Sequence, residues 1–240
     1  MPQTIKHFYL QLFFSLFFIF TCCGQNNIVI PKEFKETAPP KVWSDKWYDL
    51  NHSNNSYKVE ILKSKLKIDA AKDVSECKLE IETGTLLGTD GGEFGGKLIF
   101  IPNDKSKSEI KITRGNINFL FRFKNKIYFI SGLAHMTFNG GGMFELKADG
   151  DNFTFEKIIE FESAPFAFTI YNDKLLVAGD KDFYVITNLK KQIIFKDVFW
   201  EGLYPNSIAV ANDKNVFVGI RGGIVKLDLT AKKLKFYKKI

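Results

Sequence analysis

The segments NDKLLVA (172–178) and NDKNVFVG (212–219) repeat one pattern, in which a polar turn is followed by an apolar strand. Two earlier copies of the pattern are NKIYFI (125–130) and TGTLLG (83–88). Short apolar runs separated by Asn-Asp or Gly-containing turns are typical of β-hairpins. The copies follow one another at intervals of 42, 48 and 41 residues, measured between Gly88, Ile130, Ala178 and Gly219.

The repeat length predicts the architecture. An interval of roughly 40–50 residues is the length of a four-stranded propeller blade, and the last copy divides into strands at 207–210, 216–220, 223–229 and 235–238. We therefore predict an all-β fold, a β-propeller-like ring of four to five four-stranded blades over residues 57–240. The strand-like segment 57–68 completes the ring or belongs to a degenerate fifth blade. A β-sandwich or barrel is the rival fold, but it does not explain the period.

Composition and charge limit the partners. A chain of 240 residues with 45% hydrophobic and 15% aromatic residues can bury the core of a globular domain. The net charge of +7 is uneven, because five lysines lie in the last nine residues. Only three arginines occur, widely spaced, whereas nucleic-acid recognition favours arginine forks on a basic stripe. We expect no nucleic-acid partner.

The N-terminus carries targeting signals. The run LQLFFSLFFIF (10–20) follows Lys6 and is typical of a secretory signal, being too short to span a bilayer as a helix. It ends in FTCCG (20–24), which resembles the bacterial lipobox, in which a cysteine receives diacylglycerol. The resemblance implies lipidation of Cys23, after a signal peptide over residues 1–22.

That reading predicts a location outside the cytoplasm. The protein would be lipid-anchored to the cell membrane or outer membrane, in the periplasm or at the cell surface, and residues 23–56 would form mostly a tether. The alternatives for this N-terminal segment are a cleaved signal peptide without lipid attachment and a short membrane anchor. Cys77 would be the only cysteine left once Cys22 departs and Cys23 is acylated, so no intrachain disulfide is expected.

Unusual loop residues are expected on one face of the ring. In a blade, the turns after the first and third strands lie on one face, and the other connections lie on the opposite face. The latter contain nearly every aromatic, acidic or imidazole loop residue, and loops on a rigid scaffold commonly carry function. The predicted ligand-binding residues are Glu93, His135, Trp200, Tyr204, Asn206 and Arg221.

Each of these residues also has a structural interpretation. Glu93 can solvate its glycine-rich turn, and His135 can cap neighbouring backbone. Trp200 and Tyr204 can pack between blades. Arg221 can pair with Glu93 or Asp180.

Two family resemblances rest on these loops. The segments GTDGGEFGGKL (88–98), SGLAH (131–135) and FWEGLYPNS (199–207) are similar to a family of secreted bacterial propeller-like proteins. The segment PNSIAVAND (205–213) resembles gluconolactonase-type propellers. In the latter, the Asn after Pro binds a divalent cation, which implies Asn206 with Glu93 or Asp180 as ligands of Ca²⁺ or Mg²⁺. The second and third repeats lack matching ligands apart from Asn118.

The sequence leaves three hypotheses for the function. The leading hypothesis is a membrane-anchored extracytoplasmic propeller that binds a protein or glycan through the loop-rich face, without catalysis, cofactor or metal. It rests on the lipobox-like Cys23 and on the lack of a recognisable nucleophile motif beside His135. One alternative is a metal-dependent lactonase-like hydrolase with Glu93 and His135 as acid and base. The other is a structural subunit of an envelope complex.

Overall fold

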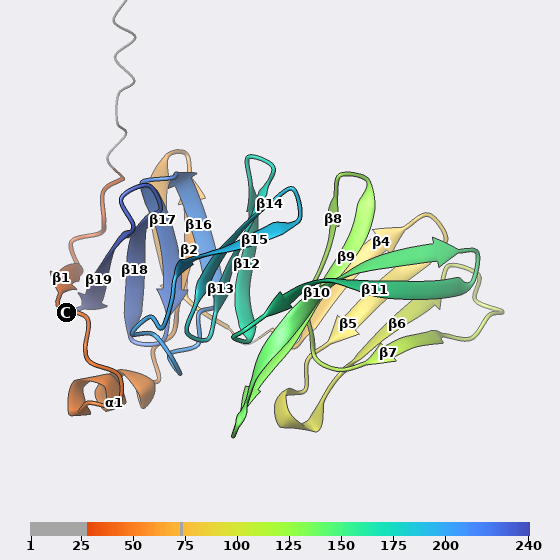
Figure 1. Cartoon of the computed structure of the whole chain (residues 1–240), viewed down its shortest axis with the longest axis horizontal. Coiled ribbons are helices and arrows are strands. Elements are labelled where there is room, and N and C mark those ends of the chain that lie inside the picture. The colour runs from red at the N-terminus through yellow and green to blue at the C-terminus, as the bar shows by residue number, and fades with distance from the viewer. Residues whose placement is uncertain (1–27, 73) are drawn as a thin grey trace, which may run out of the picture.

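A computed structural model describes residues 28–72 and 74–240. Four antiparallel sheets follow one another along the chain (Figure 1). Sheet 1 contains β4 (Glu76–Ile81), β5 (Gly84–Thr89), β6 (Lys97–Pro102) and β7 (Ile110–Arg114). Sheet 2 contains β8 (Ile117–Phe123), β9 (Lys126–His135), β10 (Phe138–Asp149) and β11 (Asn152–Phe161). Sheet 3 contains β12 (Pro165–Tyr171), β13 (Lys174–Gly179), β14 (Phe183–Thr187) and β15 (Lys190–Phe195). Sheet 4 contains β16 (Ser207–Asn212), β17 (Asn215–Ile220), β18 (Gly223–Asp228) and β19 (Lys233–Lys239).

The predicted repeat is confirmed at the level of these sheets. Their first strands begin 41, 48 and 42 residues apart, and each sheet is a simple meander in chain order. All four positions aligned from the sequence fall in the second strand of a sheet, in β5, β9, β13 and β17. The four strands expected in the last repeat are present, with ends that differ by up to two residues.

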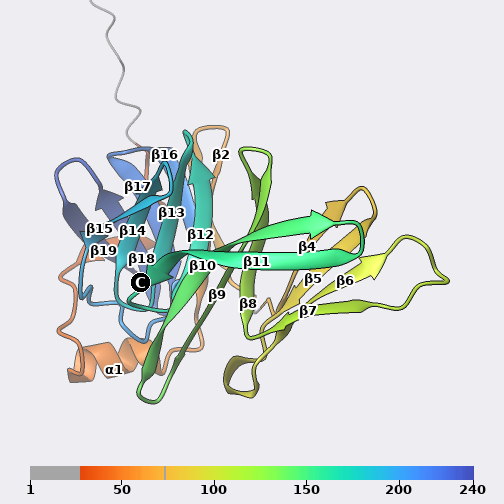
Figure 2. The ribbon, with the colours of Figure 1, turned by 45° about the vertical axis from the view of Figure 1, so that its right-hand side comes forward.

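The hydrophobic core lies between consecutive sheets. One apolar cluster joins sheets 1 and 2, a second joins sheets 2 and 3, and a third joins sheets 3 and 4. The first strands are neighbours, because β4 contacts β8, β8 contacts β12 and β12 contacts β16. Figure 2 shows the sheets fanned side by side in this order. An inner strand such as β17 is buried along its whole length because both faces of its sheet are covered.

A two-stranded hairpin covers the outer side of sheet 4. It contains β2 (Tyr57–Leu62) and β3 (Lys65–Ala70), and β2 contacts β16 and β17. Val59 N donates to Ser207 Oγ at 2.9 Å. Gly219 permits this approach, because a Cβ at that position would overlap the carbonyl oxygen of Tyr57. The strand-like segment 57–68 is thus a hairpin packed beside the last sheet.

The folded part begins before residue 57. β1 (Phe34–Thr37) pairs with β19 as a fifth strand of sheet 4. α1 (Asp45–Asn51) begins at its N-cap Ser44 and buries Trp47 and Leu50, each 2% exposed. The prediction assigned residues 23–56 to a tether, but these two elements pack on the sheets instead. They are too short to show a periodic pattern in the sequence.

The lipidation site lies outside the described residues. Cys23 and the apolar leader belong to residues 1–27. Within residues 28–72 and 74–240, no helix has the length and apolar character needed to cross a membrane.

The connections lie on two opposite sides. We call the side with the turns after the first and third strands the hairpin face, and it includes the β2–β3 turn. We call the other side the loop face; it contains η1 (Gly92–Phe94), the β9–β10 turn and the connections between sheets. In Figure 1 the β2–β3 and β8–β9 turns point upward and the β6–β7 and β10–β11 turns point to the right, whereas η1, α1 and the β9–β10 turn lie at the bottom.

Candidate functional site

Two of the predicted residues form a pair on the loop face. Glu93 lies in η1 and His135 is the last residue of β9, so the two side chains come from adjacent sheets. Glu93 Oε2 lies 3.3 Å from His135 Nε2, and both side chains are nearly half exposed. The pair bridges sheets 1 and 2 at the surface. Neither residue lines the cavity described next.

Three other predicted residues line one cavity of about 480 Å³. Tyr204 and Asn206 lie in the connection that leads into β16, and Arg221 follows β17. The Arg221 guanidinium carbon lies 4.4 Å from the centre of the Tyr204 ring, and Arg221 Nη1 donates to the Asn51 carbonyl at 2.8 Å. This stacking keeps the Tyr204 ring, 44% exposed, in a fixed orientation. Asn206 Oδ1 accepts a hydrogen bond from Ser207 Oγ at 3.0 Å.

The first strands of three sheets supply much of the remaining wall. Cys77 lies in β4, Asn118 and Phe119 lie in β8, and Phe166 lies in β12. The β8–β9 register shifts between Ile117 and Phe119, and the β12–β13 register shifts between Pro165 and Ala167. Asn118 and Phe166 therefore lie at the two positions where the strand pairing is irregular. Such irregularities change the direction of side chains and are frequent beside functional sites.

The cavity contains one polar atom that lacks a partner. Asn118 Nδ2 donates to Asp90 Oδ2 at 2.8 Å, and Gly92 N donates to Asp90 Oδ1 at 2.9 Å. Asn118 Oδ1 is buried and accepts no hydrogen bond from any described residue. Buried polar atoms are normally paired, so this unpaired oxygen is exceptional; it is closed to solvent, and a ligand would reach it only if the cavity wall around it opened.

Cys77 is not an activated nucleophile. Burial raises the pKa of its thiol to about 11. Its Sγ donates to the Ile117 carbonyl at 3.5 Å. The thiol therefore stays protonated at neutral pH, and no catalytic chemistry is assigned to it.

Trp200 does not belong to the site. The residue is fully buried, and its indole N–H donates to the Gly179 carbonyl at 3.1 Å. It lies in the core between sheets 3 and 4, so no ligand on the surface reaches it. This burial argues against the prediction that Trp200 binds ligand and favours the interpretation that it packs between sheets. Sequence position alone did not separate Trp200 from Tyr204, because both lie in the same connection.

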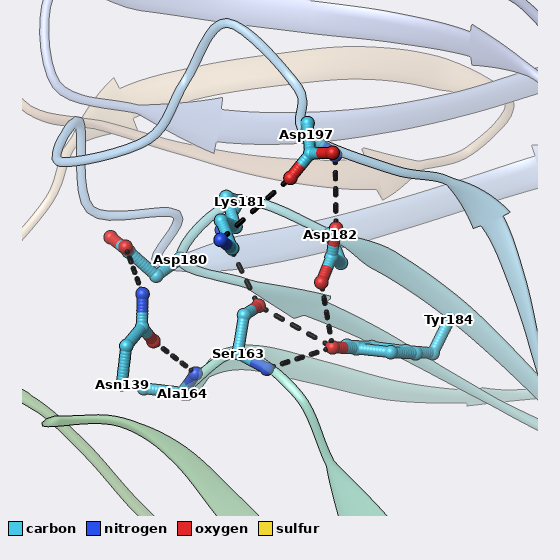
Figure 3. Close-up of polar contacts among 8 residues, drawn as sticks. All are labelled: Asn139, Ser163, Ala164, Asp180, Lys181, Asp182, Tyr184 and Asp197. Atoms are coloured by element: carbon cyan, nitrogen blue, oxygen red, sulfur yellow. Dashed lines mark hydrogen bonds and ion pairs between the residues drawn. The ribbon is translucent and has the colours of Figure 1, made fainter.

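A second polar cluster beside the cavity has a structural role (Figure 3). Asp180 Oδ2 accepts from Asn139 Nδ2 at 2.8 Å, and its Oδ1 accepts from Gly202 N at 3.0 Å. Asn139 Oδ1 in turn accepts from Ala164 N at 2.7 Å. These bonds join sheet 2, sheet 3 and the connection into sheet 4. Burial raises the pKa of Asp180, more than its two hydrogen bonds lower it.

In the neighbouring part of this cluster, hydrogen bonds of Asp182 and Tyr184 stabilise the β13–β14 turn. Tyr184 Oη donates to Asp182 Oδ2 at 3.1 Å and accepts from Ser163 N at 3.0 Å. Asp197 N donates to Asp182 Oδ1 at 3.0 Å. Burial raises the pKa of Tyr184 well above its usual value. Each named group thus has a partner within the protein (Figure 3).

The residues suggested for a divalent cation are not brought together. Asn206 lines the cavity, whereas Glu93 pairs with His135 and Asp180 is held by Asn139 and Gly202. Among the residues that the structure describes, no group of three His, Cys, Asp or Glu side chains could hold a metal ion. Arg221 forms no ion pair with Glu93 or Asp180 and stacks on Tyr204 instead.

Comparison with known proteins adds no assignment. The sequence matches no protein-family profile. No curated protein is similar to it at a significant level. Any function therefore has to be argued from the cavity and its surroundings.

Proposed function

We propose that the protein is a membrane-anchored, extracytoplasmic binding protein that takes up a glycan in the loop-face cavity without transforming it. The observation that carries the proposal is the set of side chains that line the cavity. The wall combines three aromatic rings, two amides, one guanidinium and three further charged side chains: Phe119, Phe166, Tyr204, Asn118, Asn206, Arg221, Lys72, Glu76 and Asp90. Sugars present apolar C–H faces together with many hydroxyls, so rings and amides in one concave site suit them.

The size of the cavity favours a small glycan over a protein ligand. A volume of about 480 Å³ lies within the roughly 300–1,000 Å³ range of small-molecule sites. A protein partner would instead need an interface of roughly 800 Å² on each side. The unpaired Asn118 Oδ1 would add an acceptor for a ligand hydroxyl if binding moved the wall that now covers it.

The proposal includes closure of the sheets into a ring. The hairpin β2–β3 would be a reduced fifth blade between sheet 4 and sheet 1. Support comes from the cavity, which is lined by Ser56 and Ala71 at the ends of this hairpin as well as by Cys77 of β4. A binding site on the axis of a ring would receive side chains from every blade. Lipid attachment at Cys23, outside the cytoplasm, is supported by the sequence of residues 10–24.

The test is ligand detection with matched variants. We would record saturation-transfer-difference NMR of the chain from Gly24 onward against a panel of neutral, amino and acidic mono- and disaccharides. Tyr204→Ala should abolish the signal of any binding sugar. Tyr48→Ala should leave it unchanged, because Tyr48 is equally exposed, at 42%, but lies on α1 away from the cavity wall. Absence of binding across the panel, or equal loss in both variants, would contradict the proposal.

A further inference from the structure

Arg221 is fixed at two points in the wall of the loop-face cavity. Its Nη1 donates to the carbonyl oxygen of Asn51, the last residue of α1, at 2.8 Å. Its guanidinium carbon lies 4.4 Å from the centre of the Tyr204 ring. A guanidinium is planar and carries all its N–H donors in one plane, so a hydrogen bond at one end and a stacked ring fix the direction of the others. The donors on Nε and Nη2 form no hydrogen bond with any residue that the structure describes.

The charge of Arg221 also lacks a counter-ion. The side chain is half-buried, and it forms no ion pair with a carboxylate of residues 28–72 or 74–240. A charge that is partly removed from water is normally paired with an opposite charge. The Asn51 carbonyl accepts one hydrogen bond but bears no net charge. Arg221 therefore brings unused donors and an uncompensated charge to the cavity wall.

The two carboxylates in the same wall already have partners in the protein. Asp90 accepts at both carboxylate oxygens, from Gly92 N at 2.9 Å and from Asn118 Nδ2 at 2.8 Å. Glu76 is exposed, and its Oε2 lies 3.5 Å from Lys78 Nζ. Both carboxylates thus have donors of their own, and neither pairs with the guanidinium.

The charged side chains are placed unevenly around the cavity. Lys72, which is exposed in the connection into β4, brings the wall to two cations and two carboxylates. The carboxylates belong to sheet 1, in β4 and after β5, whereas Arg221 follows β17 of sheet 4. The wall therefore has no net charge that would attract anions. Its distinguishing feature is one oriented cation, with unused donors, that is stacked on the exposed Tyr204 ring.

We propose that the sugar bound in the cavity is an acidic one, with its anionic group paired to Arg221 and its carbon skeleton against Tyr204. This inference rests on the proposed sugar-binding function. A carboxylate or a phosphate ester presents two oxygens that match the fork of the Nε and Nη2 donors, and such bidentate pairs are among the strongest hydrogen bonds in proteins. A neutral sugar would leave the guanidinium unpaired, and an amino sugar would place a second cation beside it.

Matched ligands test the inference on the unaltered protein. We would titrate the chain from Gly24 onward at neutral pH with glucuronic acid, galacturonic acid and glucose 6-phosphate, and follow binding by NMR. The neutral counterparts are the two methyl esters and glucose, and glucosamine represents the amino sugars. At least one acidic sugar should bind about tenfold or more tightly than its neutral counterpart, because the counterpart keeps the ring but lacks the charge. The tightest of the three acidic sugars shows whether the anionic group is a carboxylate or a phosphate.

Two results of this titration have different meanings. If every acidic sugar binds no more tightly than its neutral counterpart, or if glucosamine binds most tightly, the inference is overturned and the binding function stands. If no sugar of the panel binds, both are overturned.

Two arginine variants assign the preference to its residue. Arg221→Gln should reduce the affinity ratio between the acidic sugar and its counterpart to less than about twofold. Arg122→Gln makes the same change at an exposed residue of β8 that does not line the cavity, and it should leave the ratio unchanged. Because Arg221 also contacts Asn51 and Tyr204, the affinity for the neutral counterpart reports whether the cavity is intact. An unchanged ratio in Arg221→Gln, or an equal fall in both variants, would contradict the inference, and the ligand comparison on the unaltered protein decides if Arg221→Gln fails to fold.

Discussion

At the residue scale, two groups of polar residues on the loop face differ in how completely their hydrogen bonds are satisfied. Asp180 uses both carboxylate oxygens to hold Asn139 and Gly202, and Asn139 uses its carbonyl on Ala164. Asn118 is different, because its amide group donates to Asp90 while its Oδ1 accepts nothing from the described residues. The Asp180 cluster is thus satisfied within the protein, whereas Asn118 keeps one unpaired acceptor.

The direction of the Asn139–Asp180 bond yields a prediction. Asp180→Asn should lower the free energy of unfolding by about 1–3 kcal/mol, because the new amide keeps the bond from Gly202 but sets its NH₂ group against that of Asn139. Asn139 cannot turn over, since its Oδ1 accepts from Ala164 N. The double variant Asn139→Asp/Asp180→Asn restores a donor opposite an acceptor and should recover most of the loss. Urea unfolding of the three proteins measures this, and failure of the double variant to recover stability would refute the assigned direction.

At the element scale, local patterns predicted the strands but not the short or irregular elements. Polar turns such as Asp173 and Asp213, each followed by an apolar run, located the second strands of the repeats correctly. α1 and β1 were missed because seven and four residues are too few to show a period. Asn118 and Phe166 were not selected as site residues because a register irregularity arises from pairing between strands, which a single sequence does not display.

The role of α1 can be measured through Trp47, which lies in the helix, and Trp43, which precedes it. Trp47 is 2% exposed and its indole N–H donates to the Glu201 carbonyl at 3.0 Å, so Trp47→Ala should lower the free energy of unfolding by about 3–5 kcal/mol. Trp43 is 61% exposed and stacks on Trp47 at a centroid distance of 4.6 Å. Trp43→Ala should cost less than about 1 kcal/mol. Denaturant unfolding distinguishes these values. An equally small loss of unfolding free energy in both variants would indicate that residues 45–51 belong to a tether instead of the folded domain.

At the scale of the whole molecule, the sheets are unequally supported. Sheet 4 shares one apolar cluster with sheet 3 and another with the hairpin β2–β3. Sheet 1 shares an apolar cluster only with sheet 2, among the described residues. The cavity is lined by β4 of sheet 1 and by Ala71, Lys72 and Val74, which lie in the connection from the hairpin to β4. In the proposed ring, the weakest contact would lie between the hairpin and sheet 1, beside the cavity, and we call this contact the seam.

This asymmetry predicts how the molecule opens. Amide hydrogens of β5 and β6 should exchange at least about tenfold faster than those of β17 and β18, because local opening free energy follows the apolar area that an element buries. Hydrogen–deuterium exchange with mass spectrometry measures both regions in one experiment. A sugar bound in the cavity contacts both sides of the seam, so it should slow exchange in β4 and in residues 71–75 more than in β17. Uniform exchange across the four sheets would show that sheet 1 is as firmly held as sheet 4, and a ligand that protects only β16–β19 would place its binding site away from the seam.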